Sequence, residues 1–269
     1  MCFMSGIKPG ALTTRYSRLY IAHDTLDLPT GRAPARPHLL PMTASIWTPL
    51  LLSLKVAGWA TVLNLVLGVA AAYALARTRS RLRDLLDSLL TLPLVLPPTV
   101  LGYYLLVLLG RRGTVGAWLD GLGIQLVFTW QGAVIASTVV AFPLVMKSAR
   151  AAFESVDHQL EAAARVLGVS ETAVFFRVTL PLAARGIAAG VLLAFARALG
   201  EFGATLMIAG NLPGRTQTLS VAIYEAVQAG DDGTANTLVL ITSITCVIVL
   251  VFASRLVQGR APNLLEQPA

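Results

Sequence analysis

Arg197 and Glu201 are the residues most able to do chemistry, because they are ionisable groups inside an otherwise apolar stretch. They are four positions apart, so on a helix they lie on one face and can form an ion pair. Ionisable groups inside a membrane span are costly and usually face protein or water rather than lipid. The pair therefore indicates either part of a polar pathway or an ion pair that holds one helix to its neighbours.

Small residues surround this pair in the string Ala196-Arg197-Ala198-Leu199-Gly200-Glu201-Phe202-Gly203-Ala204-Thr205. The two glycines permit either the close approach of a second helix or a local break in this one. The candidate pathway or gate residues in this string are Arg197, Gly200, Glu201, Phe202, Gly203 and Thr205.

A second unusual string contains three prolines within six residues, Pro93, Pro97 and Pro98. Each proline removes a backbone donor and clashes with the preceding turn, so an undisturbed helix is excluded here. Broken backbone at membrane depth is tolerated only where protein or a cavity shields it. Pro97 and Pro98 are therefore further candidates for the pathway, and the alternative is a simple kink packed on neighbouring helices.

The stretch from Glu161 to Pro181 is a charged, helix-forming segment in a mostly apolar chain. Its Ala, Glu, Arg and Leu residues favour helix, Gly168 can end one in a left-handed turn, and Ser170 can cap the next. Pro181 is expected to end the segment just before another apolar run. We predict a short helix, a glycine corner and a second short helix, which together suit docking against a partner protein.

Catalytic motifs are missing from the sequence. It contains no Gly-x-x-x-x-Gly-Lys phosphate loop, no His or Cys cluster with metal-ligand spacing, and no nucleophile–base constellation. The two cysteines, Cys2 and Cys246, imply no disulfide framework. We therefore predict no catalytic residue, no metal site and no cofactor in this chain, so any energy must come from a partner.

The composition is that of a membrane protein. Of the 269 residues, 55% are hydrophobic and 13% charged, whereas about a quarter of a soluble domain is charged. The net charge of +7 would suggest nucleic acid for a soluble protein, but in a membrane protein it reflects Arg and Lys in cytoplasmic loops, and we expect no nucleic-acid partner.

Five membrane-spanning helices are predicted from apolar runs of about 20 residues or more. The run Arg77, Arg79, Arg81 and Arg83 directly after the first span marks the cytoplasmic side, which puts the amino terminus outside and the carboxyl terminus inside. Arg111 and Arg112 then lie outside, as an exception to the charge rule. The predicted spans are approximately 47–77, 85–109, 127–146, 186–209 and 238–257.

Three further segments complete the predicted organisation. Residues 1–41 have no long apolar run and are interpreted as a disordered tail, with Met42 as the natural start; an arm that binds a partner is the alternative. Residues 42–260 form the membrane domain, with a cytoplasmic loop at about 150–183, and residues 261–269 form a carboxyl-terminal tail.

Glu161 to Pro181 also resembles the EAA loop of ABC-importer permeases. A Glu-Ala-Ala triplet precedes Gly168, and nine residues separate Gly168 from Val178-Thr179-Leu180-Pro181. Glu161 lies seven positions before Gly168, one more than usual, so either Ala162 occupies the Glu position or the helix enters one residue early. The resemblance implies that ATP-binding subunits dock on Glu161, Ala162, Ala163, Arg165, Leu167, Gly168, Val169, Ser170, Leu180 and Pro181.

The proline string and the string Arg-Ala-Leu-Gly-Glu-Phe-Gly-Ala both resemble segments of permeases for molybdate and related oxyanions. The resemblance implies an all-α integral membrane protein with the type I ABC importer (MetI-like) permease fold. It also implies a homodimer in the cytoplasmic membrane, two subunits that bind ATP and Mg, and an extracytoplasmic oxyanion-binding protein that docks outside.

Other functions stay open at this point. Sulfate, thiosulfate and tungstate permeases carry similar strings, so the transported oxyanion is not decided by them. An ion-coupled secondary transporter would usually show internal repeats and paired ionisable residues at mid-membrane, and the chain has one such pair and no clear repeat. A membrane enzyme would need the catalytic constellation that is missing.

Overall fold

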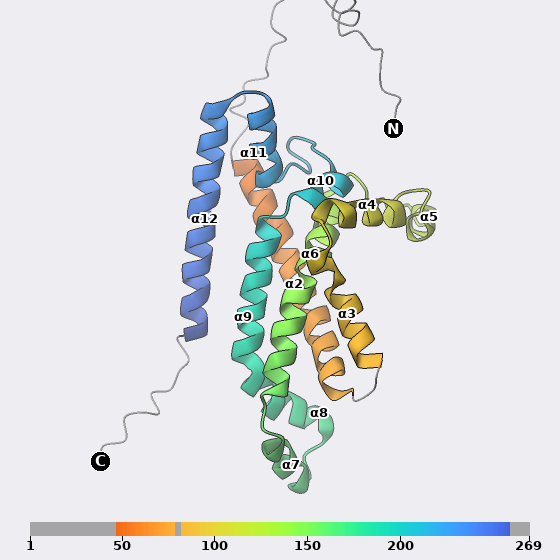
Figure 1. The fold of residues 1–269 in the computed structure, drawn as a ribbon, viewed down its shortest axis with the longest axis vertical. Coiled ribbons are helices and arrows are strands. Elements are labelled where there is room, and N and C mark those ends of the chain that lie inside the picture. The colour runs from red at the N-terminus through yellow and green to blue at the C-terminus, as the bar shows by residue number, and fades with distance from the viewer. Residues whose placement is uncertain (1–46, 79–81, 259–269) are drawn as a thin grey trace, which may run out of the picture. The chain divides into compact units, whose positions relative to one another are not determined.

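The computed structural model describes residues 47–78 and 82–258, and within these residues all regular structure is helical (Figure 1). The all-α fold class expected from the sequence is therefore confirmed. The predictions of a disordered tail over 1–41, a start at Met42 and a tail over 261–269 lie outside the described residues, as do Arg79 and Arg81.

Three long helices pack side by side at the centre of the described region (Figure 1). They are α2 (Trp47–Arg77), α6 (Trp130–Glu154) and α9 (Leu180–Leu199). Most of the residues buried between them are small, chiefly alanine, glycine and serine. Small side chains let helix backbones approach closely, which is how helices associate where lipid removes the hydrophobic drive.

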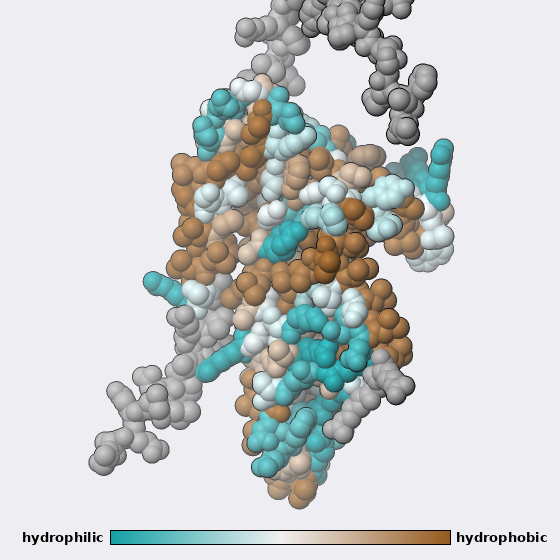
Figure 2. All heavy atoms as spheres, in the orientation of Figure 1, coloured by the Kyte–Doolittle hydropathy of each residue, from teal (hydrophilic) through white to brown (hydrophobic). Residues whose placement is uncertain are grey.

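Two helices near the carboxyl end pack on the outside of this group. The short α11 (Leu219–Gln228) contacts both α2 and the long α12 (Asp232–Gln258), and α12 also contacts α9. Only 11% of the most apolar window of α12 is buried, and its surface is largely hydrophobic in Figure 2. An apolar helix with so little protein around it is typical of a membrane span.

The spans differ from the sequence prediction in their ends. Four described helices are long and apolar enough to cross a membrane, and a bent pair of shorter helices gives the predicted fifth when it is counted as one span. α6 continues eight residues beyond the predicted end at 146, and α12 begins six residues before 238. The fourth span stops at Leu199 instead of running on to 209, and a separate short helix, α10 (Gly203–Ala209), follows it.

The bent pair consists of α3 (Leu82–Val95) and α4 (Pro98–Leu109), between which the helix axis bends by 110°. Proline has no N–H and constrains the residue before it, so the chain turns at Pro97 and restarts with Pro98 in the first turn of α4. The predicted disruption of the second span is confirmed. Beyond α4 lies α5 (Thr114–Gly121), a helix that the sequence analysis missed.

The predicted docking segment forms α7 (His158–Val166), a corner at Gly168 and α8 (Glu171–Val174). The prediction that Pro181 ends this segment is wrong. α8 passes through a π-helical turn, Phe175–Thr179, directly into α9, so that Glu171–Leu199 is one helical run. Pro181 lies just after this turn, so its missing N–H falls where the hydrogen-bond pattern changes from π-helical to α-helical.

Candidate functional site

Two breaks in helical structure meet in one cavity. The first is the bend at Pro97 between α3 and α4, and the second is the interruption of residues 200–202 between α9 and α10. α4 packs against α10, which brings the two breaks together although about a hundred residues separate them in the chain. The cavity has a volume of about 280 Å³ and is lined by Pro98, Thr99, Arg197, Gly200, Glu201, Phe202 and Gly203.

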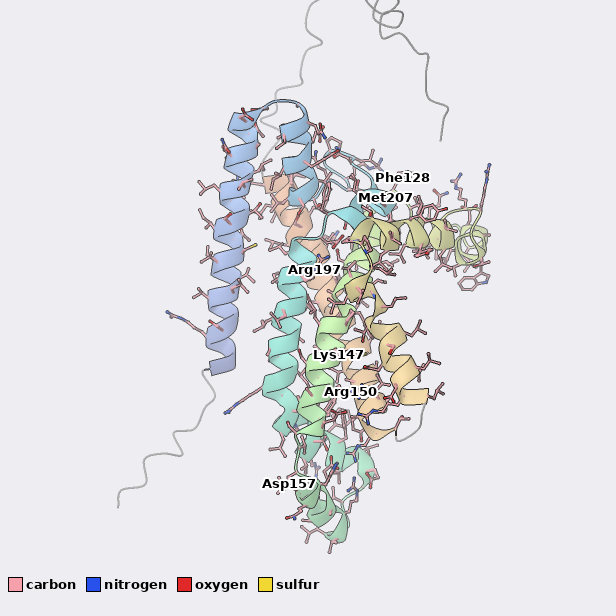
Figure 3. All side chains as sticks on the ribbon, in the orientation of Figure 1. Phe128, Lys147, Arg150, Asp157, Arg197 and Met207 are labelled. Atoms are coloured by element: carbon pink, nitrogen blue, oxygen red, sulfur yellow. The ribbon has the colours of Figure 1, made fainter. Side chains whose placement is uncertain are left out.

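The contact between α4 and α10 depends on glycine. A Cβ atom on Gly102 would lie 2.7 Å from Cβ of Met207 and 2.9 Å from Cα of Ala204, closer than carbon atoms pack. A Cβ on Gly203 would lie 3.1 Å from Cβ of Pro98. The missing side chains let the backbones of the two broken segments come close to each other. Met207 and Arg197 are labelled in this part of the molecule in Figure 3.

The predicted ion pair forms beside this cavity. Nη1 of Arg197 lies 2.7 Å from Oε2 of Glu201, and the backbone N–H of Ala204 donates to Oε1 of Glu201 at 2.9 Å. Glu201 is 2% exposed, whereas the Arg197 side chain is 33% exposed and lines the cavity. The pair gives the cavity a guanidinium that a ligand can reach, with a buried carboxylate that neutralises its charge.

Not every predicted pathway residue lines this cavity. Pro97 is exposed at the bend, and Thr205 is 1% exposed in the interior, where its hydroxyl has no hydrogen-bond partner. The ring of Phe202 packs against Tyr224 of α11, with centroids 5.1 Å apart. Thr99 does line the cavity and was missed, because a threonine beside two prolines carries no signal of its own.

The docking segment has the predicted corner. Gly168 has φ of +80°, a left-handed conformation that glycine adopts without strain, and its Cβ position is open to solvent. Ser170 stands at the start of α8, but its side chain makes no capping bond, so that part of the prediction is wrong. The side chain that caps a helix here is Asp157, whose Oδ1 accepts the N–H of Gln159 at 2.8 Å.

Apolar side chains project from this segment into solvent. Leu167, one of the residues predicted to dock, is 83% exposed, and its neighbour Val166, which was not among them, is 88% exposed directly before the corner. Among the other residues predicted to dock, Ala162, Ala163, Gly168, Ser170 and Pro181 are exposed, while Arg165, Val169 and Leu180 are partly buried. Exposed aliphatic residues on a charged knob are typical of a surface that a partner protein covers.

Glu161 differs from the rest of the predicted docking residues because it is buried. Its side chain is 2% exposed, Nη2 of Arg77 lies 2.5 Å from its Oε1, and the hydroxyl of Thr179 donates to the same oxygen at 2.6 Å. Burial alone would raise the pKa of Glu161, but the bonds from Thr179 and Arg77 outweigh it and lower the pKa below its ordinary value. No spacing in the sequence indicated Arg77 or Thr179 as partners.

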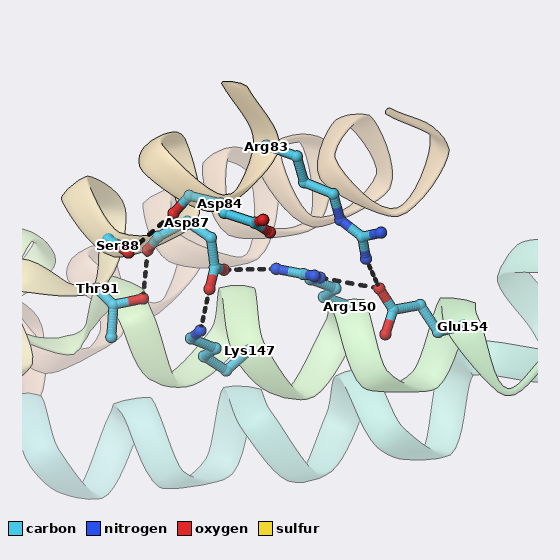
Figure 4. A network of polar contacts seen from close by, with 8 residues as sticks. All are labelled: Arg83, Asp84, Asp87, Ser88, Thr91, Lys147, Arg150 and Glu154. Carbon is cyan, nitrogen blue, oxygen red and sulfur yellow. Dashed lines mark hydrogen bonds and ion pairs between the residues drawn. The ribbon is translucent and has the colours of Figure 1, made fainter. Parts of the chain in front are cut away.

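A more exposed charged network joins α3 to α6 (Figure 4). Asp87 contacts Nζ of Lys147 at 2.5 Å and Nη1 of Arg150 at 2.6 Å. Glu154 accepts from Arg83 and, at 2.9 Å, from Arg150. α3 buries none of its residues, so these ion pairs are its main polar attachment to the central helices.

Across residues 47–78 and 82–258, no group of three His, Cys, Asp or Glu side chains could hold a metal ion.

The sequence was compared with models of known protein families. Residues 64–262 match the family described as binding-protein-dependent transport system inner membrane component. The chain belongs to this family. The matched residues include the bent pair, the predicted docking segment and the residues that line the cavity.

Curated relatives within this transport family include the molybdenum transport system permease protein ModB of Escherichia coli strain K12. It is 46% identical over 213 residues, which are 78% of this chain and 93% of the relative. A putative molybdenum transport system permease protein of Bacillus subtilis strain 168 is 43% identical over 218 residues, 80% of this chain and 94% of the relative.

Solved structures of the same architecture come from other importers. A chain of the MetNI methionine ABC transporter in an inward-facing conformation aligns with a TM-score of 0.68 at 18% identity, covering 83% of this chain and 99% of that one. A bacterial ABC transporter that imports alginate aligns with a TM-score of 0.67 at 14% identity, covering 94% and 91%. These similarities show that this family member has the MetI-type importer fold.

Proposed function

We propose that this chain is the permease subunit of an ATP-driven importer of molybdate. The observation that carries the proposal is the meeting of the two strings that resemble molybdate permeases at one cavity. The identity of 46% to a molybdenum transport permease extends across both strings and supports the same substrate. Tungstate, which has the same shape and charge, is expected to share the route.

The charges around the cavity suit weak, transient binding of a dianion rather than tight binding. Arg197 offers a positive, partly exposed guanidinium that can meet an oxyanion by bidentate hydrogen bonds. Glu201 offsets that charge from a buried position 2.7 Å away, so an anion is attracted only weakly. Transport needs binding that is favourable enough to enter and weak enough to leave. In this mechanism an external binding protein supplies most of the selection between oxyanions.

Energy for transport comes from separate ATP-binding subunits in this proposal. They dock on the knob, which is the exposed part of the segment Glu161–Pro181 with Val166, Leu167 and Gly168 at its corner. These subunits, and not this chain, bind ATP and Mg. Two copies of the chain form the conduit, which rocks between inward-open and outward-open states, as expected for alternating access. The knob lies in the cytoplasm, the amino terminus outside, and the protein in the cytoplasmic membrane.

The experiment that tests the proposal uses the full chain, its ATP-binding subunit and its binding protein in proteoliposomes. We expect ATP hydrolysis and uptake to rise with molybdate and tungstate, and to rise much less with sulfate. A preference for sulfate would overturn the assignment of molybdate as the substrate. Uptake that follows an ion gradient and continues without ATP would instead indicate a secondary transporter.

The docking surface is tested by Gly168→Asp. The position is open, so the new side chain meets no clash, but it acquires left-handed strain of about 1–2 kcal/mol and puts a negative charge on the knob. We expect normal membrane insertion, loss of co-elution with the ATP-binding subunit, and uptake at background. Normal co-elution and uptake would show that the knob is not the docking surface.

Gly123→Asp is the matched control for this variant. Gly123 also has positive φ, +75°, and an open Cβ position, but it follows α5 and lies outside the docking segment. Because the backbone strain is the same in both variants, only the location of the new charge differs. We expect Gly123→Asp to keep co-elution and uptake.

A further inference from the structure

The carboxylate of Glu161 joins three segments that are distant in the chain. Glu161 belongs to α7, Arg77 is the last residue of α2, and Thr179 is the last residue of the π-helical turn that leads into α9. Arg77 and Thr179 both bind Oε1 of Glu161, at 2.5 Å and 2.6 Å. One oxygen atom therefore connects the docking helix to two membrane-spanning helices.

The Glu161 carboxylate is buried, and two aromatic residues, Tyr73 and Phe153, line the same small pocket as it does. Aromatic rings pack beside it: Tyr73 lies 4.6 Å from Phe175 and 5.5 Å from Phe153, measured between centroids. The guanidinium of Arg77 also sits 5.2 Å from the centre of the Tyr73 ring. Ion pairs and hydrogen bonds are stronger in such low-dielectric surroundings than in water, and their geometry is more strongly enforced.

α7 has few other attachments to the helices of the membrane domain. It packs mainly on α8 and the π-helical turn, while Leu160, Val166 and Leu167 project into solvent. Besides the chain links of α7 to α6 and α8, the Glu161–Arg77 contact gives a push on the exposed side of α7 a direct polar connection to α2. The second contact, with Thr179, passes the same push to the start of α9.

We propose that Glu161 is a positioning residue that transmits movement of the docking helix to α2 and α9. The inference rests on the proposed function, since it requires a partner that moves α7. It assigns Glu161 a role inside this chain and not on the surface of the partner: with 2% of its side chain exposed, the carboxylate cannot reach a docked protein unless α7 rotates.

The test is Glu161→Gln in the complete complex, which keeps the shape of the side chain and removes its charge. We expect the ATP-binding subunit to co-elute normally and ATP hydrolysis to persist. Uptake per ATP hydrolysed should fall about ten-fold, within the range of energies by which residues along coupling networks act. A residue that only stabilised the fold would lower assembly, hydrolysis and uptake together.

Glu154→Gln is the matched control. Glu154 is also a glutamate held by arginine, but its side chain is 43% exposed, and its two ion pairs are with Arg83 of α3 and Arg150 of α6, not with α7. We expect its uptake per ATP to equal that of the wild type. The double variant Arg77→Glu with Glu161→Arg exchanges the two charges and so restores the ion pair between α2 and α7. It should recover part of the uptake per ATP hydrolysed that Glu161→Gln loses.

The outcomes separate this inference from the proposed function. A wild-type complex without ATP-driven uptake would overturn the proposed function and the inference with it. If the wild type transports but Glu161→Gln has an unchanged ratio of uptake to hydrolysis, the inference alone is overturned. Loss of co-elution in Glu161→Gln would also overturn it, because Glu161 would then act in docking.

Discussion

Glu161 and Glu201 are two buried glutamates that are each held by an arginine, and their partners differ in distance along the chain. Glu201 contacts Arg197 four residues before it and accepts the N–H of Ala204 three residues after it. Glu161 bonds to Arg77, 84 residues away, and to Thr179, 18 residues away. Both residues are 2% exposed.

This difference indicates two uses for a buried charge. The contacts of Glu201 stay within one interrupted helix, so they define the local path of the backbone and the charge beside the cavity. The contacts of Glu161 hold separate segments together, so they determine how those segments move relative to one another. A change at the first position should alter what passes through the protein, and a change at the second should alter how passage is driven.

The largest expected effect comes from Arg197→Met. It leaves Glu201 buried without its counter-charge, which costs about 3–5 kcal/mol for a fully buried pair and about 1–3 here because the Arg197 side chain is one-third exposed. It also turns the cavity negative. We expect uptake near background, checked in proteoliposomes together with a melting curve.

Two companion variants sharpen the comparison. The double variant Arg197→Met with Glu201→Gln should recover thermal stability, because it removes the unpaired carboxylate. Arg77→Met should be milder than Arg197→Met in the melting curve, because Glu161 keeps its bond from Thr179 and lies 3.5 Å from Arg165. Equal losses in the two arginine variants would contradict the distinction between the two glutamates.

An intermediate effect is expected from Gly102→Val. The new side chain would push α4 away from α10, since even a Cβ would lie 2.7 Å from Met207, and overpacking of this kind costs about 1–3 kcal/mol. Uptake should fall while the docking segment stays intact, as measured by co-elution of the ATP-binding subunit. Gly121→Val is the control, because a Cβ at Gly121 meets nothing within 4 Å.

The smallest expected effect is on acid stability. The folded protein lowers the pKa of Glu161 below the ordinary value of 4.5, so this carboxylate stabilises the fold fully above that pH and loses its contribution as pH falls through its lowered pKa. The difference in melting temperature between wild type and Glu161→Gln should therefore be constant at neutral pH and shrink in acid. A difference that grows in acid would contradict the assigned ion pair.

Local features of the molecule could be predicted from the sequence. The pairing of Arg197 with Glu201 follows from helical spacing, the interruption at Pro97 from proline chemistry, and the left-handed corner at Gly168 from its position after a helix-forming run. Each depends on residues within about one or two turns of each other, where backbone geometry alone decides the outcome.

Features that depend on distant partners could not be predicted. The burial of Glu161 requires Arg77 and Thr179 to arrive at one place, and nothing in the spacing of these residues indicates it. The passage of the chain through Pro181 without a break depends on the π-helical turn before it. The glycines of the fourth span allowed a local break or a close helix approach, and the structure has both: the helix is interrupted after Leu199, and α10 packs closely on α4 at Gly203.

The unbroken run from Glu171 to Leu199 has a mechanical consequence. It contains 29 residues and is about 43 Å long at the ordinary helical rise. Its first turn belongs to the knob, and its last residue adjoins the interruption at Gly200 beside the cavity. A tilt of about 5° at one end of such a rod displaces the other by nearly 4 Å, so a small movement at the knob becomes a displacement of side-chain size beside the cavity.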